Sequence, residues 1–180
     1  MISSTRLLGT VIQDNLCWDL NTGELAKKAN ARMELLRRVA SFCNDIQELK
    51  NIYILFVRSI LEQSATVWHS SITQENKSDL ERVQKSALKV ILGENYKSYE
   101  NALNILDLET LDARREKLCL TFAKRSAKHP KMKQMFPLDE KTHDMDTRNP
   151  GKYKVQHAFT DRLKDSPLIF MQNLLNENDG

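Results

Sequence analysis

The stretch LERVQKSALKVILG, residues 80–93, is the sequence feature that most limits what this chain can fold into. Its apolar residues recur at steps of three and four, which places them on one stripe of an amphipathic helix. The stripe consists of Leu80, Val83, Ala87, Leu88 and Ile91. Arg82, Lys85 and Lys89 fall on the other side, while Thr73 is a candidate N-cap and Gly93 a candidate stop. A helix with one apolar stripe must bury it, so the rest of the chain has to supply a packing partner.

The composition favours a helical protein with a core of ordinary size. Hydrophobic residues make up 41% and charged residues 28% of the 180 positions, and five Gly and four Pro are few for a turn-rich sheet protein. The formal net charge of +3 is too small to identify a nucleic-acid binder by itself. No apolar run approaches the roughly 20 residues that cross a bilayer, and no signal peptide is evident. We therefore expect an intracellular protein without a membrane partner.

Periodicity and capping residues predict about five helices. The first begins near Asn21 or Thr22 and ends near Cys43, and the second follows a cap at Asp45 and reaches Trp68. The third is the stretch that Thr73 caps. Two more are expected, a short one after Ser98 and a long one from Thr110 to Pro130. The second has the widest apolar stripe, so we expect it at the centre of the bundle.

Both ends of the chain differ from this helical middle. At the N-terminus, Leu7–Ile12 is expected to form a strand, with Leu16 and Trp18 returning on a second strand. Residues 131–180 contain a locally acidic stretch at 139–146, and only Leu168–Leu175 is apolar enough to dock as a short helix or strand. We thus predict a mainly α fold in three parts: a hairpin at 1–20, a helical bundle at 21–130 and an extended or partly ordered tail at 131–180.

The sequence contains no self-contained active site. The histidines lack partners at zinc-ligand spacing, and we expect all four at the surface: His69, His129, His143 and His157. The three cysteines are far apart, and we expect them to be reduced. Glu62 stands one helical turn after Arg58, so an ion pair is the simplest interpretation of that carboxylate. We predict no metal and no cofactor.

Basic residues concentrate between positions 114 and 133, where eight Lys and Arg oppose only Glu116, for a local charge of +7. This segment, together with Arg82, Lys85 and Lys89, could form a phosphate-facing surface. The alternative is the ordinary solvated face of a helical domain, and charge alone does not separate the two.

Several motifs in the same order resemble the C-terminal part of a reverse transcriptase from a non-LTR (LINE-type, jockey-like) retrotransposon. Residues 80–93 are close to that family's L-E-x-x-Q-[KR]-x-A-L-[KR]-x-I-x-G. Arg58 to Glu62 and Val67-Trp68 match R-x-x-L-E-Y-x-x-x-V-W, with Gln63 in the aromatic place and Thr66 in a place where proline is common. Leu108 to Leu118 matches L-x-[ST]-L-x-x-R-R-x-x-L.

A weaker match lies at the N-terminus, where Leu8-Gly9, Leu16 and Trp18 resemble the family's last palm strands, with Gln13 in an acidic place. The similarity covers roughly residues 6 to 137, and the tail from Leu138 onward has no match.

The resemblance implies the end of a polymerase palm, a helical thumb and a helical extension. In that family the thumb holds the template–primer duplex, so the implied partners are an RNA–DNA or template–primer duplex backbone and the remaining palm and fingers of a parent RNA-directed DNA polymerase. The palm aspartates that bind metal would lie upstream of Met1, so we expect this chain alone not to be an enzyme. The candidate phosphate contacts are basic residues of the third and last helices. They are Arg82, Lys85, Lys89, Arg114, Arg115, Lys117, Lys124 and Arg125.

The alternative is a helical protein-interaction module derived from a decayed retroelement, in which the binding role has been lost. A small enzyme of unrelated descent would need a catalytic constellation that the sequence lacks. Whether the chain is a whole product, a fragment or a relic, and whether it forms oligomers, stays open at this level.

Overall fold

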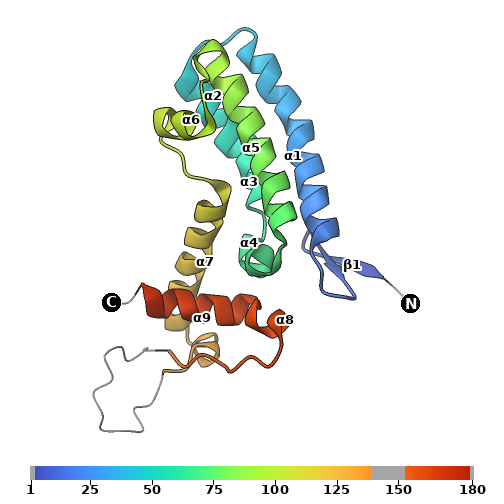
Figure 1. Cartoon of the computed structure of the whole chain (residues 1–180), viewed down its shortest axis with the longest axis vertical. Helices are drawn as coiled ribbons and strands as arrows, with labels where there is room; N and C mark the ends of the chain where they lie inside the picture. The colour runs from blue at the N-terminus through green and yellow to red at the C-terminus, as the bar shows by residue number, and fades with distance from the viewer. Residues whose placement is uncertain (1–2, 139–152, 179–180) are drawn as a thin grey trace. The chain divides into compact units, whose positions relative to one another are not determined.

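The computed structural model of the chain describes residues 3–138 and 153–178, which divide into two compact units (Figure 1). The first unit comprises residues 1–65 and 72–115, and the second comprises residues 66–71 and 116–180. The described residues are mainly helical, with one two-stranded antiparallel hairpin at the N-terminal end. The predicted fold class is therefore confirmed.

The hairpin exists but is displaced from its predicted position. Strand β1 (Ser4–Leu7) pairs with β2 (Thr10–Gln13), and the turn between them is formed by Leu8 and Gly9 at φ +49° and +85°. Two consecutive positive φ values are typical of the tight hairpin turn whose twist matches that of paired strands. Leu7–Ile12 thus spans a turn, and the prediction of a returning strand at Leu16 and Trp18 was wrong.

Gly9 lies where the hairpin meets the end of the second predicted helix. A Cβ atom at Gly9 would come within 2.7 Å of Gln63 Nε2, the end of a flexible side chain that can shift, so the position favours glycine because of its φ of +85°. Nearby, the Thr10 hydroxyl donates to Ser64 Oγ at 2.9 Å, and Val11 N donates to Asn21 Oδ1 at 3.1 Å. These contacts attach the hairpin to the helices of the first unit.

The first unit is built around two long helices that pack along each other, α1 (Asp19–Ala40) and α5 (Gln74–Leu92). Behind them in Figure 1 lie α2 (Ile46–Ile52), the π-helical turn η1 (Tyr53–Arg58) and α3 (Ser59–Leu61). The short turn η3 (Gly93–Asn95), α6 (Tyr99–Leu106) and the start of α7 (Leu111–Lys128) complete the unit. The predicted stripe of α5 is its core face, since Leu80, Val83, Ala87, Leu88 and Ile91 are all buried.

The predicted single helix from Asp45 to Trp68 is interrupted. It widens into the π-helical turn η1 and stops at Ser64, which has φ +53°, before α4 (Ala65–Trp68) and the 3-10 turn η2 (His69–Ser71). Ser64 accepts a hydrogen bond from Thr10, a residue outside this segment, and helical periodicity cannot predict such a contact. Residues 66–71 belong to the second unit, so this segment is not one central helix.

The predicted caps are confirmed in position and chemistry. Asp45 Oδ1 accepts from Gln47 N at 2.7 Å and Thr73 Oγ1 accepts from Asn76 N at 3.2 Å, each satisfying an amide that the first helical turn leaves without a partner. Further along the chain, Ser98 and Thr110 accept in the same way from Asn101 N and Ala113 N. Helix α5 ends at Gly93, which has φ +50°.

The second unit has a core of its own, in which α7 packs with α9 (Pro167–Glu177). It also contains η4 (Lys133–Met135) and α8 (Asp161–Lys164). The buried core residues are Cys119, Ala123, Phe136, Met171, Leu174 and Leu175. The segment predicted to dock does so as a helix, but it packs on α7, so a boundary at residue 130 does not match the observed units. The acidic stretch at 139–146 and His143 lie outside the described residues.

One histidine departs from its predicted surface position. His69 is buried, with its ring 5.8 Å from that of Phe170 in an edge-on arrangement, whereas His129 and His157 are exposed. In the described part of the chain, no helix is long and apolar enough to span a membrane.

Candidate nucleic-acid interface

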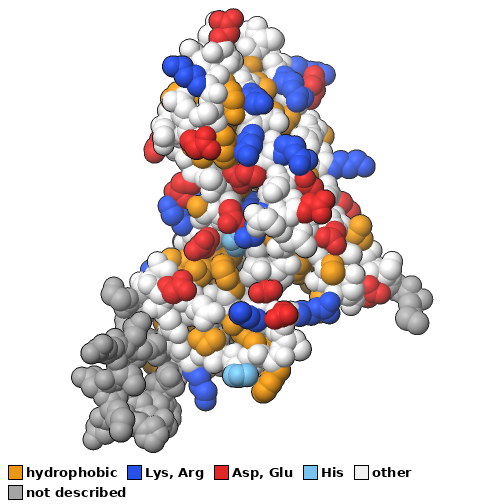
Figure 2. Space-filling model, in the orientation of Figure 1, with side chains coloured by type: hydrophobic (Ala, Val, Ile, Leu, Met, Phe, Trp, Pro, Cys, Tyr) orange, Lys and Arg blue, Asp and Glu red, His pale blue; other side chains and the backbone are white. Residues whose placement is uncertain are grey.

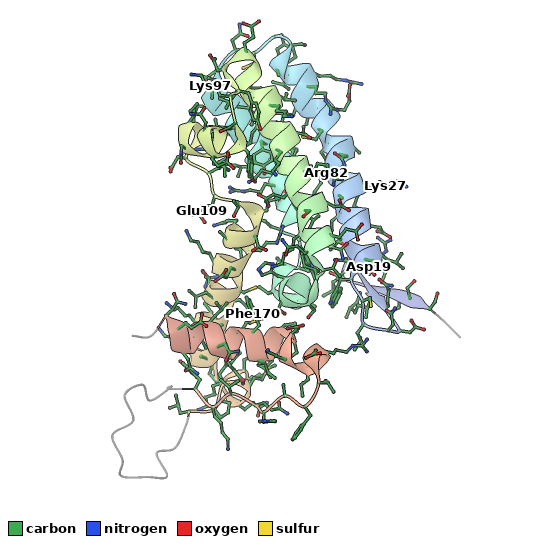
Figure 3. All side chains as sticks on the ribbon, viewed as in Figure 1. Asp19, Lys27, Arg82, Lys97, Glu109 and Phe170 are labelled. Carbon is green, nitrogen blue, oxygen red and sulfur yellow. The ribbon has the colours of Figure 1, made fainter. Side chains whose placement is uncertain are left out.

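The three predicted contacts on α5, Arg82, Lys85 and Lys89, are exposed, as the helical spacing predicts, but each already has a neighbour. Arg82 Nη1 lies 3.0 Å from Asp79 Oδ1. The ammonium groups of Lys85 and Lys89 lie over aromatic rings, 4.9 Å from the Tyr99 centroid and 5.5 Å from the Tyr96 centroid. Such cation–π contacts restrain the lysines without neutralising their charge. In Figure 3, Arg82 on α5 lies beside α1, which carries Lys27.

Carboxylates are interspersed with these cations. Figure 2 shows Lys and Arg side chains spread over the upper part of the first unit, with Asp and Glu side chains between and below them. The exposed face of α5 is therefore of mixed charge rather than uniformly positive.

The inner side of α5 carries a buried polar network. Gln84 is 1% exposed, and its Oε1 accepts from the Tyr53 hydroxyl at 2.5 Å. Its Nε2 donates to Tyr99 Oη at 2.8 Å and to the carbonyl of Glu109 at 2.9 Å. Figure 3 places Glu109 in the linker between α6 and α7. One glutamine side chain thus joins three segments of the first unit, and all its hydrogen-bonding groups are used.

Glu81 extends the network to the beginning of α7. The Tyr99 hydroxyl donates to Glu81 Oε1, and Leu111 N donates to both carboxylate oxygens at 3.1 and 3.2 Å. A carboxylate at a helix N-terminus satisfies an orphan amide and opposes the positive end of the helix dipole. Burial, followed by the bond to Glu81, raises the pKa of Tyr99 above its ordinary value of 10.0, and burial does the same for Tyr53. Both hydroxyl groups therefore stay protonated at neutral pH.

A cavity of about 240 Å³ opens beside this network. Its lining residues are Gln74, Lys77, Ser78, Glu81, Lys85, Tyr99, Thr110 and Asp112. The two carboxylates are already engaged, Glu81 by the Leu111 amide and Asp112 by Lys77 Nζ at 3.0 Å. The described residues include no group of His, Cys, Asp and Glu that could hold a metal ion.

The predicted ion pair between Arg58 and Glu62 is confirmed, with Arg58 Nε 3.3 Å from Glu62 Oε1. Arg114 joins it from α7, donating from Nε to the same oxygen at 3.2 Å. Two of these three side chains are only about 15% exposed, so solvent screens them incompletely. Arg114, a candidate phosphate contact, is therefore part of a cross-link inside the first unit.

Arg115 does not lie on a surface at all. Its exposed fraction is 0%, and its Nη2 lies 3.8 Å from Asp112 Oδ1. Because Arg115 follows Arg114 in a run of charged residues, the sequence predicts that it is exposed. A helix turns about 100° per residue, however, so consecutive side chains point to different faces. Arg115 is therefore removed from the candidate interface.

The second-unit part of α7 carries the clearest cationic surface. Lys117, Lys124 and Lys128 are seven and four residues apart and so lie on one face, with Arg125 beside them. We call these four exposed residues the α7 stripe. The opposite face holds the buried residues Cys119, Ala123 and Ser126. The helix is thus cationic outside and apolar inside, over about 16 Å of its length at 1.5 Å per residue.

Acidic residues are less frequent around the α7 stripe than around the basic residues of α5. Residues 117–138 contain no Asp or Glu, and exposed Lys131 and Lys133 follow the stripe. Within residues 3–138 and 153–178, the ion pairs do not include Lys124, Arg125 or Lys128. Lys128 belongs to the basic segment 114–133 predicted to face phosphates but not to the eight named contacts, and its spacing of eleven residues from Lys117 places it on the same face.

Comparison with models of known protein families, with curated proteins and with solved structures finds no match for this chain.

Proposed function

We propose that this chain is a thumb-like segment of a retrotransposon RNA-directed DNA polymerase and holds the backbone of an RNA–DNA or template–primer duplex. The order of the motifs in residues 6–137 supports the resemblance. Because those motifs match the palm end and thumb only, the proposal assigns the chain duplex holding and no polymerase chemistry. The remaining palm and fingers of a parent polymerase are its other proposed partners.

The observation that carries the proposal is the α7 stripe. Four cations are exposed on one helical face, and the ten residues that follow them contain no carboxylate. Such a surface fits the regularly spaced phosphates of a nucleic-acid backbone better than an acidic protein patch of varied shape. Lysine and arginine side chains reach phosphates without reading bases, as a grip on an A-like hybrid requires. Arg82, Lys85 and Lys89 on α5 are secondary contacts, because acidic residues are interspersed with them on the same helix.

The test is the salt dependence of binding to an RNA–DNA hybrid, measured by fluorescence anisotropy with the full chain. Replacing Lys117, Lys124, Arg125 and Lys128 together by alanine should lower the slope of log affinity against log salt by up to about 4, one counterion per lost phosphate contact. The expected result is weak, nearly salt-independent residual binding.

A matched control removes the same charge from another helix. Lys27, Lys28, Arg32 and Arg37 on α1 are exposed, and two of them pair with Glu24 and Glu34. Their replacement by alanine should leave the slope nearly unchanged. Equal losses in the two quadruple variants, or no salt dependence in the original chain, would remove the support for a specific grip by α7.

The alternative function, a helical protein-interaction module, rests on a different observation. Leu55 and Phe56 are adjacent on η1 and are 66% and 46% exposed, an apolar pair on an irregular helical turn. If hybrid binding shows no salt dependence while replacing Leu55 and Phe56 by serine abolishes a protein association, the interaction module becomes the better proposal.

A further inference from the structure

An aromatic pair is displayed on the second unit, apart from the α7 helix. The rings of His157 and Phe159 lie 4.7 Å apart between centroids and are tilted by 55°. Phe159 is 86% exposed, although a phenyl group gains by burial. His157 lies against Phe159, and the high exposure leaves the ring accessible to a further flat group.

The backbone on both sides of this pair is fixed. Before it, Lys154 N donates to the carbonyl of Pro137 at 2.8 Å, and Tyr153 exchanges two hydrogen bonds of 3.0 Å with the Asn176 side chain. After it, Thr160 Oγ1 accepts from Leu163 N and caps α8. The rings are thus carried on a short segment held at both ends, which lowers the ordering cost of binding.

The unit that carries the pair is positively charged. Its residues, 66–71 and 116–180, contain twelve Lys and Arg against nine Asp and Glu, a net charge of +3. Three exposed cations are close to the pair in sequence, Lys154 before it and Arg162 and Lys164 after it. An aromatic surface within a cationic unit is typical of sites that bind single-stranded nucleic acid.

We infer that His157 and Phe159 form a stacking platform for an unpaired base of a single-stranded nucleic acid. Every base has a π face, so such a platform accepts any sequence, while lysine and arginine neutralise the flanking phosphates. A base inside a duplex is already stacked on its neighbours. The platform therefore takes a different ligand from the duplex backbone proposed for the α7 stripe and goes beyond that function.

The experiment measures binding of the full chain to a labelled oligo-dT strand of about 12 nucleotides, within the usual site size for such proteins. Phe159→Ala should weaken binding about tenfold, the loss expected for one base–aromatic contact, whereas Phe159→Trp should retain it. Binding of an RNA–DNA hybrid should not change. Unaltered oligo-dT binding by Phe159→Ala, or no binding by the original chain, would overturn the platform and favour a protein contact for this pair.

Two controls make the result specific to stacking. Phe42→Ala removes another phenyl group, 76% exposed and in the first unit, and should leave oligo-dT binding unchanged. An abasic strand of the same length retains phosphates but no bases, so Phe159→Ala should bind it as the original chain does; a tenfold loss there would contradict stacking. For the variant in which Lys117, Lys124, Arg125 and Lys128 are replaced by alanine, binding of the RNA–DNA hybrid is measured. The stacking platform and the duplex grip are therefore tested independently.

Discussion

Helices α5 and α7 are both amphipathic with basic outer faces, but the structure uses their polar residues differently. On α5 the polar residues face inward as well as outward, and Glu81 and Gln84 join η1, α6 and the start of α7. In the second-unit part of α7, the buried face consists of small or apolar residues and the cations are outside. Two helices with equal periodicity can therefore differ in function: α5 contains an internal hydrogen-bond network, whereas α7 presents an open charged surface.

The residues that carry the resemblance to the retrotransposon polymerases are mostly internal. Glu81 and Gln84 belong to the buried network, Arg58 and Glu62 to an ion pair, and Arg115 to the interior. Their chemistry fixes the positions of helices. These motif residues therefore stabilise the fold, and three of the four residues of the α7 stripe, Lys124, Arg125 and Lys128, lie outside the motifs.

The largest expected effect is that of Gln84→Ala. The substitution leaves the Tyr53 hydroxyl buried without its acceptor, so the free energy of unfolding of the first unit should fall by about 2–4 kcal/mol. Urea unfolding followed by far-ultraviolet circular dichroism measures the change. Gln74→Ala, at an exposed position of the same helix, is the control and should change it by under about 0.5 kcal/mol. Equal effects in the two variants would contradict the contrast between the two faces of α5.

A smaller effect on stability is expected when a buried arginine and an exposed lysine of α7 are compared. Arg115→Ala removes a fully buried guanidinium and should lower the free energy of unfolding by about 2 kcal/mol, whereas Lys124→Ala at an exposed position should cost under about 0.5 kcal/mol. Lys124→Ala should weaken hybrid binding instead. A destabilising Lys124→Ala together with a neutral Arg115→Ala would reverse the assignment of structural and surface roles.

The smallest expected effect is a dependence of stability on alkaline pH. Because the pKa of Tyr99 is raised in the folded state, the unfolded chain releases this proton first, near pH 10, and the folded chain only at higher pH. The stabilisation is therefore complete below pH 10 and is lost as the pH rises above it. The urea midpoint should fall across that range, and less steeply in Tyr99→Phe. Parallel declines in the two proteins would show that Tyr99 is not responsible.

Much of the local structure could be predicted from the sequence because its causes are local. The stripe of α5, the caps at Asp45, Thr73 and Ser98 and the ion pair of Arg58 with Glu62 all depend on residues within one or two helical turns. Side-chain periodicity and backbone capping act over that distance.

The failures of prediction concern contacts between residues far apart in the chain. Ser64, in the helix break, accepts a hydrogen bond from Thr10, and the burial of His69 accompanies a ring contact with Phe170. The docking of α9 on α7 likewise joins the tail to a helix that was assigned to the bundle. A local sequence pattern does not indicate which distant residue a side chain contacts.

The helical class, the capped ends of the helices and the cluster of positive charge at 114–133 follow from the order of the residues. Which of the cations are exposed depends on how the helices pack. The tertiary structure ties Arg114 to Glu62, buries Arg115 and leaves the α7 stripe exposed. The physical reason is that charge is a property of composition, whereas exposure depends on which helical face is packed against the core.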